Sequence, residues 1–518
     1  MVKQYLGLRG RSLQFAISFV CTTGFLLFGY DQGVMSGIIT APEFNREIPE
    51  TKDNSTMQGF VTAIYEIGCL VGAVFVLIVG ERLGRRRSIM TGAFIMIAGV
   101  LIQVTAYSGH QSLAQFVVGR IVTGLGNGMN TSSIPTYQAE CAKTKNRGLL
   151  ICIEGGSIAF GTLISYWLNY GVSFTKTDAV WRFPIAFQIV FAIIMIVFML
   201  FLPESPRWLL SKDLDREGTE VIAALNDADI DSHVVQTEKR VILDSMAASA
   251  KNKATYRDLF TGGKTQHFRR MLIGASSQLM QQIGGCNAVI YYFPILFQES
   301  IGQTRDMSLI MGGVNMIVYA IFATTSWFII ERAGRRKLFL IGTIGQMTAM
   351  TITFCCLIPG TQGAAKGAAA GLFLYIASFG ATWLPLPWLY PAEINPLRTR
   401  GKANAVSTIT NWLFNFVVVM ITPIMIDRIG WGTYVFFAAI NASFLPFIYL
   451  FYPETRRRSL EEIDFIFAKG FEEDISYVRA AKELPLLSAE EVEEYAVRYG
   501  FVIDSREDGK GSGGSKDA

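Results

Sequence analysis

The sequence is poor in charged residues and in the side chains from which enzyme sites are built. Charged residues make up 17% of the 518 residues, against about a quarter in soluble proteins, and the chain has three histidines. The seven cysteines fall mostly inside apolar segments, which indicates buried small side chains rather than a disulfide framework or a zinc site. A net charge of +4 indicates no nucleic-acid partner. Without a nucleophile motif or a phosphate loop in context, the sequence predicts no enzyme, no metal and no cofactor.

Long apolar runs are what the sequence has instead. Hydrophobic residues make up 51% of the chain, and the mean hydropathy is +0.35. They gather in blocks of about 20 residues, the length at which a helix crosses the apolar core of a bilayer. We expect twelve spans, at residues 13–36, 58–79, 88–107, 112–136, 149–171, 182–202, 270–297, 307–330, 337–358, 367–390, 402–426 and 431–452.

Short charged motifs recur at a nearly constant distance along the chain. RLGRR at 82–86 returns as RAGRR at 332–336, RG at 147–148 as RG at 400–401, and PESPR at 203–207 as PETRR at 453–457. Such a repeat indicates two parallel halves of six spans each. The predicted fold is an all-α membrane protein with two pseudo-symmetric halves and cytoplasmic helices. Its parts are a first half (1–202), a helical insert (203–269), a second half (270–452) and a tail (453–518).

The distribution of basic residues predicts the orientation. Arginine and lysine concentrate in alternate loops, such as 82–87 and 332–337, whereas 40–57, the first loop on the opposite side, is net negative. Because basic loops stay in the cytoplasm, both termini, the insert and the tail are expected there. We predict a multi-pass protein of the plasma membrane.

Four charged residues stand out inside the predicted spans, away from the span ends, where each costs about 2.5–3.5 kcal/mol at the bilayer centre. Asp31 and Arg120 belong to separate spans of the first half and can neutralise each other. Proximity of the arginine favours an ionised carboxylate, and separation favours a protonated one, so the pair can carry a proton. Glu154 is a second candidate for proton coupling, and Glu66 a third that neighbouring hydroxyl or backbone groups can satisfy. The alternative interpretation is that Asp31 and Arg120 form a static structural pair.

Uncharged hydrogen-bonding side chains gather in the second half. Gln282, Asn287 and Tyr291 can project to roughly one side of the seventh span. Amides offer donors and acceptors without charge, and tryptophan adds an apolar ring face, which together suit a neutral, hydroxyl-rich solute. A single buried amide would indicate helix packing, but the whole set predicts a binding site. The predicted substrate-binding residues are Gln281, Gln282, Asn287, Tyr291, Asn315, Trp388 and Asn411.

The repeated junctions also hold acidic residues that a topology signal does not require. Paired with the arginines, they can join the two halves on the cytoplasmic side in the outward-open state and separate during the cycle. The alternative is that the junctions mark topology alone. This predicted cytoplasmic latch comprises Arg85, Glu140, Arg147, Glu204, Arg335, Glu393, Arg400 and Glu454.

With these motifs in order, the chain resembles the sugar porters of the major facilitator superfamily. The matching motifs are GYDQG at 29–33, GRR at 84–86, GR at 119–120, PESPRWL at 203–209, QQ…N…YY at 281–292, GRR at 334–336 and PET at 453–455. They span nearly all of residues 13–467. The resemblance implies alternating access and a central monosaccharide site that includes the glutamine, asparagine and tryptophan residues above. In the family's proton symporters, it also implies that Asp31 works with Arg120, although some facilitators keep that aspartate.

One position departs from the family pattern. Where sugar porters carry a sugar-binding glutamine in the fifth span, this chain has Gly155, preceded by Glu154. One contact of the first half is therefore missing or replaced. The Glu154-Gly155 run, Tyr65-Glu66 and the tail around 484–493 resemble a fungal branch that includes glycerol–proton symporters and hexose transporters.

These observations predict a transporter of monosaccharides, with a hexose as the first candidate, that is coupled to proton symport. Its predicted partners are a sugar or polyol, protons and the lipid bilayer. A facilitative sugar uniporter, a polyol–proton symporter and a nutrient sensor remain as alternatives. The stretch after Pro453 is about 65 residues (518 − 453), shorter than the tails with which sensors bind partners.

Overall fold

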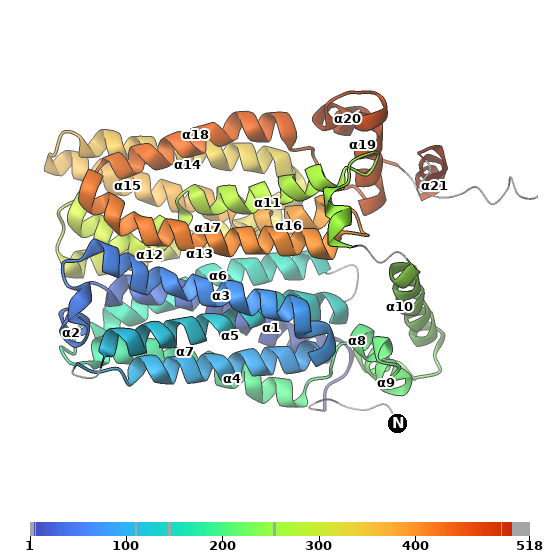
Figure 1. The fold of residues 1–518 in the computed structure, drawn as a ribbon, viewed down its shortest axis with the longest axis horizontal. Helices are drawn as coiled ribbons and strands as arrows, with labels where there is room; N and C mark the ends of the chain where they lie inside the picture. Colours follow the sequence, from blue (N-terminus) through green and yellow to red (C-terminus); the bar gives the residue numbers. More distant parts are fainter. Residues whose placement is uncertain are drawn as a thin grey trace, which may run out of the picture.

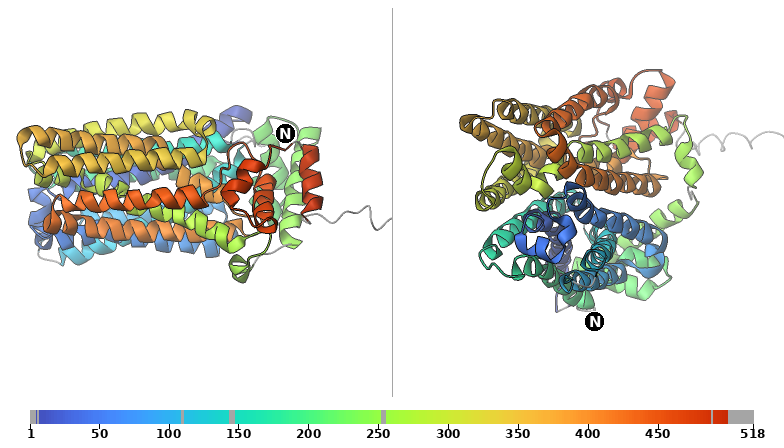
Figure 2. Two further views of the ribbon diagram at one scale, coloured as in Figure 1. Left: turned by 90° about the horizontal axis from the view of Figure 1, so that it is seen from above. Right: turned by 60° about the vertical axis from the view of Figure 1, so that its left-hand side comes forward.

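The computed structural model describes residues 5, 7–108, 111–142, 147–251, 255–487 and 489–499. Two groups of long helices lie side by side along one direction (Figures 1 and 2). At one end of the bundle, here called the junction end, lie α8 (Pro206–Ser211), α9 (Asp215–Asn226), α10 (His233–Lys251), α19 (Leu460–Glu472), α20 (Tyr477–Glu483) and α21 (Ala489–Arg498). The opposite end carries α2 (Pro42–Glu47) and is called the α2 end.

Each group of long helices contains six of the predicted spans. The first half comprises α1 (Gly10–Ile38), α3 (Ser55–Leu83), α4 (Arg85–Val104), α5 (Ser112–Cys141), α6 (Arg147–Val172) and α7 (Ala179–Phe201). The second half comprises α11 (His267–Ile283) with α12 (Cys286–Ile295), α13 (Arg305–Ala333), α14 (Arg335–Leu357), α15 (Gln362–Ser378) with α16 (Leu386–Ile394), α17 (Arg400–Ile429) and α18 (Gly432–Phe451). Nine stretches of the described chain are long and apolar enough to cross a membrane. The predicted all-α, twelve-span fold is confirmed.

Two spans of the second half are broken near their middle. Gly284 and Gly285 separate α11 from α12, and Gly285 adopts φ +98°, which glycine tolerates best. Between α15 and α16 lies a π-helical turn, η5 (Phe379–Trp383), a feature common at functional sites. The breaks place Gln281 near the end of α11, where its side chain bonds to the carbonyl group of Trp383 in η5.

The repeated glycine–arginine motif begins a helix in each half. Gly84 precedes α4 with φ +90°, and Gly334 precedes α14 with φ +91°. A Cβ atom at either glycine would lie 2.6 Å from a carboxylate oxygen, of Glu204 or Glu454 respectively. Only glycine allows these carboxylates to approach the positive N-terminal end of the helix so closely.

The first helices of the insert and the tail attach to different halves. In the insert, the carbonyl of Leu225 accepts a hydrogen bond from Gln14 of α1 at 3.1 Å. In the tail, Asp464 of α19 forms a 2.6 Å ion pair with the fully buried Arg270 of α11. Each half therefore carries its own helical cap at the junction end.

Candidate functional site

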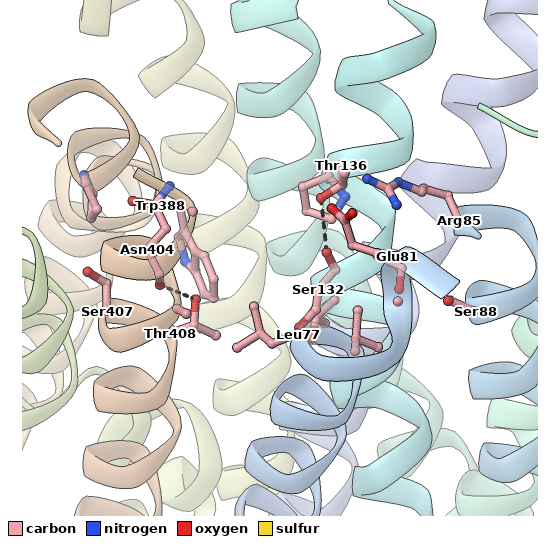
Figure 3. Close-up of a pocket in the computed structure, with 18 of the residues that line it drawn as sticks. Leu77, Glu81, Arg85, Ser88, Ser132, Thr136, Trp388, Asn404, Ser407 and Thr408 are labelled. Carbon is pink, nitrogen blue, oxygen red and sulfur yellow. Dashed lines mark hydrogen bonds between the residues drawn. The ribbon is translucent and has the colours of Figure 1, made fainter. Parts of the chain in front are cut away.

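A cavity of about 440 Å³ opens between the halves at the junction end. Figure 3 shows Leu77 and Ser132 of the first half on one side, and Trp388 and Thr408 of the second half on the other. Its lining also includes Gln278, in the middle of the bundle. The halves are therefore parted on this side as far as the centre.

At the α2 end the halves are in contact. The Arg305 guanidinium, on α13, donates to the carbonyl of Gly37, on α1, at 3.0 Å. The Ser55 hydroxyl, on α3, donates to the Asp427 carboxylate, on α17, at 3.1 Å. The centre of the molecule is thus reached from the junction end, while the α2 end is closed.

Three amide side chains of the second half form a buried network. Asn411 donates to the side-chain oxygens of Gln278 and Gln281. Gln281 donates in turn to the carbonyl of Trp383 at 2.7 Å, a group that the break at η5 exposes. These residues are held in fixed orientations because each amide is both donor and acceptor.

A second amide group lies beside the first. Asn287, at the start of α12, donates to Gln282 at 2.7 Å and to Asn415 of α17 at 2.6 Å. A small central hollow of about 20 Å³, enough for roughly one water molecule, lies against both groups. The predicted binding residues that line it are Gln281, Gln282, Asn287, Trp388 and Asn411.

Two predicted binding residues lie elsewhere. The Tyr291 hydroxyl donates to Glu66 of the first half at 2.5 Å. Asn315 is fully buried on α13, and its amide atoms have no hydrogen-bond partner among the described residues. The sequence interpretation missed Gln278 and Asn415, although each lies about one helical turn from a predicted residue, Gln281 or Asn411, and on the same face.

The predicted acid–base pair of the first half is connected through a tyrosine. Tyr65 of α3 donates to the Asp31 carboxylate at 2.9 Å, and the Arg120 guanidinium lies 4.6 Å from the centre of the Tyr65 ring. Arg120 donates to the carbonyl of Thr62 at 3.1 Å, and Asn127 donates to the Tyr65 hydroxyl. The structure therefore gathers Asp31 and Arg120 in one buried cluster without a direct ion pair.

Glu154 does not join this cluster. It is 2% exposed on α6, and its carboxylate oxygens have no hydrogen-bond partner among the described residues. It interacts electrostatically with the buried thiol of Cys21 on α1. Beside it, a Cβ atom on Gly155 would meet open space, so the position where the family has a glutamine leaves room at this point of the first half.

Most of the predicted latch residues pair within their own half. Arg85 makes two hydrogen bonds to Glu140, at 3.0 and 3.1 Å, while Glu204 accepts from the backbone N–H of Arg85 at 3.0 Å. Burial raises the pKa of Glu204, and backbone N–H groups of Ser205, Arg86 and Arg85 oppose that shift. The cluster ties α4, α5 and the insert together.

The second half repeats this arrangement. Arg335 donates to Glu393 at 2.7 Å, and Glu454 accepts from the backbone N–H of Arg335 at 2.8 Å. Arg400 donates instead to the carbonyl of Asn395. The side chain of Arg147 lies outside the described residues. A latch between the halves is not formed in this state and stays a prediction for the state in which the junction end is closed.

Known proteins with similar sequences are transporters. Residues 16–467 match the family described as "Sugar (and other) transporter". The chain is 47% identical over 508 residues to the sugar transporter STL1 of Saccharomyces cerevisiae, covering 97% of this chain and 89% of the relative. It is 31% identical over 471 residues to a low-affinity glucose transporter of Kluyveromyces lactis, covering 86% of this chain and 81% of the relative. The prediction that the chain is not an enzyme is confirmed.

Solved structures with the same fold include the xylose transporter XylE of Escherichia coli. Its inward-open form superimposes with a TM-score of 0.72 at 26% identity, covering 87% of this chain and 99% of that chain. The proton:xylose symporter XylE bound to 6-bromo-6-deoxy-D-glucose gives a TM-score of 0.74 at 26% identity, covering 88% and 99%. With its twelve-helix fold, its repeated junctions and these matches, the chain belongs to the sugar transporter family of the major facilitator superfamily.

Proposed function

We propose that this protein carries a monosaccharide or a polyol across the plasma membrane together with a proton, by alternating access. The observation that carries the proposal is the central amide network, which ends at a cavity open to the junction end alone. Basic loops place the junction end in the cytoplasm, so the structure corresponds to an inward-facing state. The relatives named for sugar, glucose and xylose transport support the same substrate class.

In this mechanism the solute replaces hydrogen bonds that the amides make with each other. Asn411, Gln281 and Asn287 already point donors and acceptors at one hollow. The hollow of about 20 Å³ must widen to admit a sugar, which a rocking motion of the halves accomplishes. Asp31 takes up the coupled proton when Arg120 is distant and releases it when Arg120 is near, because a nearby guanidinium favours the ionised carboxylate.

The two junction clusters are proposed to approach one another in the opposite state. Arg85 with Glu140 and Arg335 with Glu393 lie at the same end of the bundle and on different halves. Exchange of partners between them would form the predicted latch when the junction end closes.

Uptake into cells that lack their own sugar carriers tests the proposal. Labelled glucose uptake is measured against competing hexoses, pentoses and glycerol, while the external pH is recorded. We expect saturable uptake with alkalinisation of the medium. Uptake without alkalinisation would indicate a facilitator, and solute binding without uptake would indicate a sensor.

A further inference from the structure

Glu66 joins the charged cluster of the first half to the amide network of the second. It is fully buried on α3, directly after Tyr65. Its Oε1 atom accepts the hydroxyl of Tyr291, on α12, at 2.5 Å. Asn415, which accepts from Asn287 at 2.6 Å, also interacts with Glu66. The carboxyl group therefore lies where the two clusters meet.

The charges in this buried region do not balance. Asp31, Glu66 and Arg120 are all fully buried, and a single guanidinium can neutralise one carboxylate. The remaining titratable groups that interact with Glu66 are neutral at pH 7. They are Cys69 and Tyr65 on α3 and Cys286, Tyr291 and Tyr292 on α12. An uncompensated buried charge is costly, so one of the two carboxyl groups holds a proton in this conformation.

The hydrogen bonds of Asp31 and Glu66 differ in whether they remain intact when the halves move. Asp31 is bonded to Tyr65, within its own half. The bond between Glu66 and Tyr291 crosses between halves, and the second carboxylate oxygen, Oε2, has no partner among the described residues. Parting the halves at the α2 end breaks this bond and brings water to Glu66, which lowers the cost of its negative charge.

We propose that Glu66 is a second proton-binding site of the transport cycle, and that it must be protonated before the halves close at the α2 end. A deprotonated Glu66 keeps that end open, and Asp31 remains the carboxylate that works with Arg120. The inference rests on the proposed transport function, and it assigns the pH dependence of closure to a contact between the halves.

Exchange of labelled for unlabelled substrate across the membrane, measured against external pH, tests this assignment. Exchange needs closure and opening but no net proton movement. We expect the exchange rate to fall as pH rises in the unmodified protein. In Glu66→Gln, whose amide oxygen still accepts from Tyr291, it should fall less steeply, because Asp31 alone still titrates. Glu50→Gln, the same change at an exposed carboxyl of the α2 end, is the matched control and should keep the original profile.

Two further variants separate a proton site from a structural contact. Tyr291→Phe removes the hydrogen bond between the halves and keeps the carboxyl group, so exchange should be slower at every pH with its pH dependence intact. Asp31→Asn should keep pH-dependent exchange. If Glu66→Gln keeps the original profile, or if Tyr291→Phe weakens the pH dependence to the same extent, the proposal is wrong.

Exchange measured in the unmodified protein and in Glu66→Gln distinguishes a failure of this inference from a failure of the proposed function. No exchange of any sugar or polyol in that protein overturns both. Exchange that persists with an unaltered pH profile in Glu66→Gln overturns only the role of Glu66. If Glu66→Gln does not reach the membrane, Glu66→Asn provides the same neutral amide for the measurement.

Discussion

The two halves are alike at their junctions and different at their centres. In each half an arginine binds a carboxylate of a neighbouring span, Glu140 or Glu393, at 3.0 and 2.7 Å respectively. In each, a tyrosine hydroxyl bonds to the carbonyl of the proline that follows the last span, Pro203 or Pro453. At the centre, the first half has buried charges, and the second half has amides.

This difference separates two tasks. Both halves must swing as rigid bodies, and the shared junctions hold the helix ends of each half together. The solute needs neutral hydrogen-bonding groups, whereas the proton needs a carboxyl group in a medium of low dielectric constant. In the proposed mechanism the two sites lie on different halves, so motion of the halves can couple them without direct contact between proton and solute.

The largest effect should come from removing the charge of Asp31 in the first half. One proton that moves through about 100 mV supplies about 2.3 kcal/mol, enough for about 50-fold accumulation of solute. Asp31→Asn should lose this accumulation and keep exchange. Steady-state accumulation of a non-metabolised substrate analogue measures the ratio. Accumulation by the variant would show that the charged centre of the first half does not carry the proton.

Substitution in the amide network should affect affinity and leave coupling intact. Asn411→Ala removes a hydrogen-bonding group that the bound solute is proposed to contact at the hollow, at a cost of about 1–3 kcal/mol in binding free energy. We expect KM to rise about 5- to 150-fold, with the proton-to-solute ratio unchanged.

The matched control is Asn441→Ala, also a buried amide of the second half, which bonds to the carbonyls of Gly284 and Phe437. It should lower thermal stability without raising KM to the same degree. Equal effects on KM would mean that the amides act as helix contacts.

The junctions should respond equally in the two halves. Arg85→Ala removes an ion pair whose side chains are 16% and 11% exposed, and Arg335→Ala removes one whose side chains are 6% and 17% exposed. Arg335→Ala also removes a pair with Glu331, which adds little because the Glu331 side chain is 61% exposed. Each should cost about 1–3 kcal/mol, less than a fully buried pair, and lower the Tm of the purified protein by a few degrees. Arg428→Ala, at a pair that is 81% and 55% exposed, is the control. A large difference between Arg85→Ala and Arg335→Ala would break the equivalence of the junctions.

The smallest effect is expected outside the junctions and the centre of the molecule. Arg479 and Glu483 form an ion pair on α20 in which the side chains are 67% and 38% exposed. Solvent screens such pairs, so Arg479→Ala should leave Tm, KM and accumulation unchanged within error. A measurable loss of uptake would show that the tail itself contributes to transport.

Much of the fold could be predicted from the sequence alone. All twelve spans coincide with helices because a run of about 20 apolar residues has few other stable arrangements in a membrane. The breaks at Gly285 and at η5 were not predicted, since apolar composition continues through both. Gln278 and Asn415 were missed for a related reason, because a lone amide in an apolar run does not reveal its partner on another helix.

The sequence by itself determined the helices, the repeat, the residues that are charged inside the membrane and the family. These follow from composition and order along the chain, which local physical chemistry governs. The tertiary structure alone decided which charges meet: Tyr65 between Asp31 and Arg120, Glu66 against Tyr291, and the junction pairs within rather than between halves. Each of these contacts joins different helices, and their spacing in the sequence holds no information about which faces are in contact.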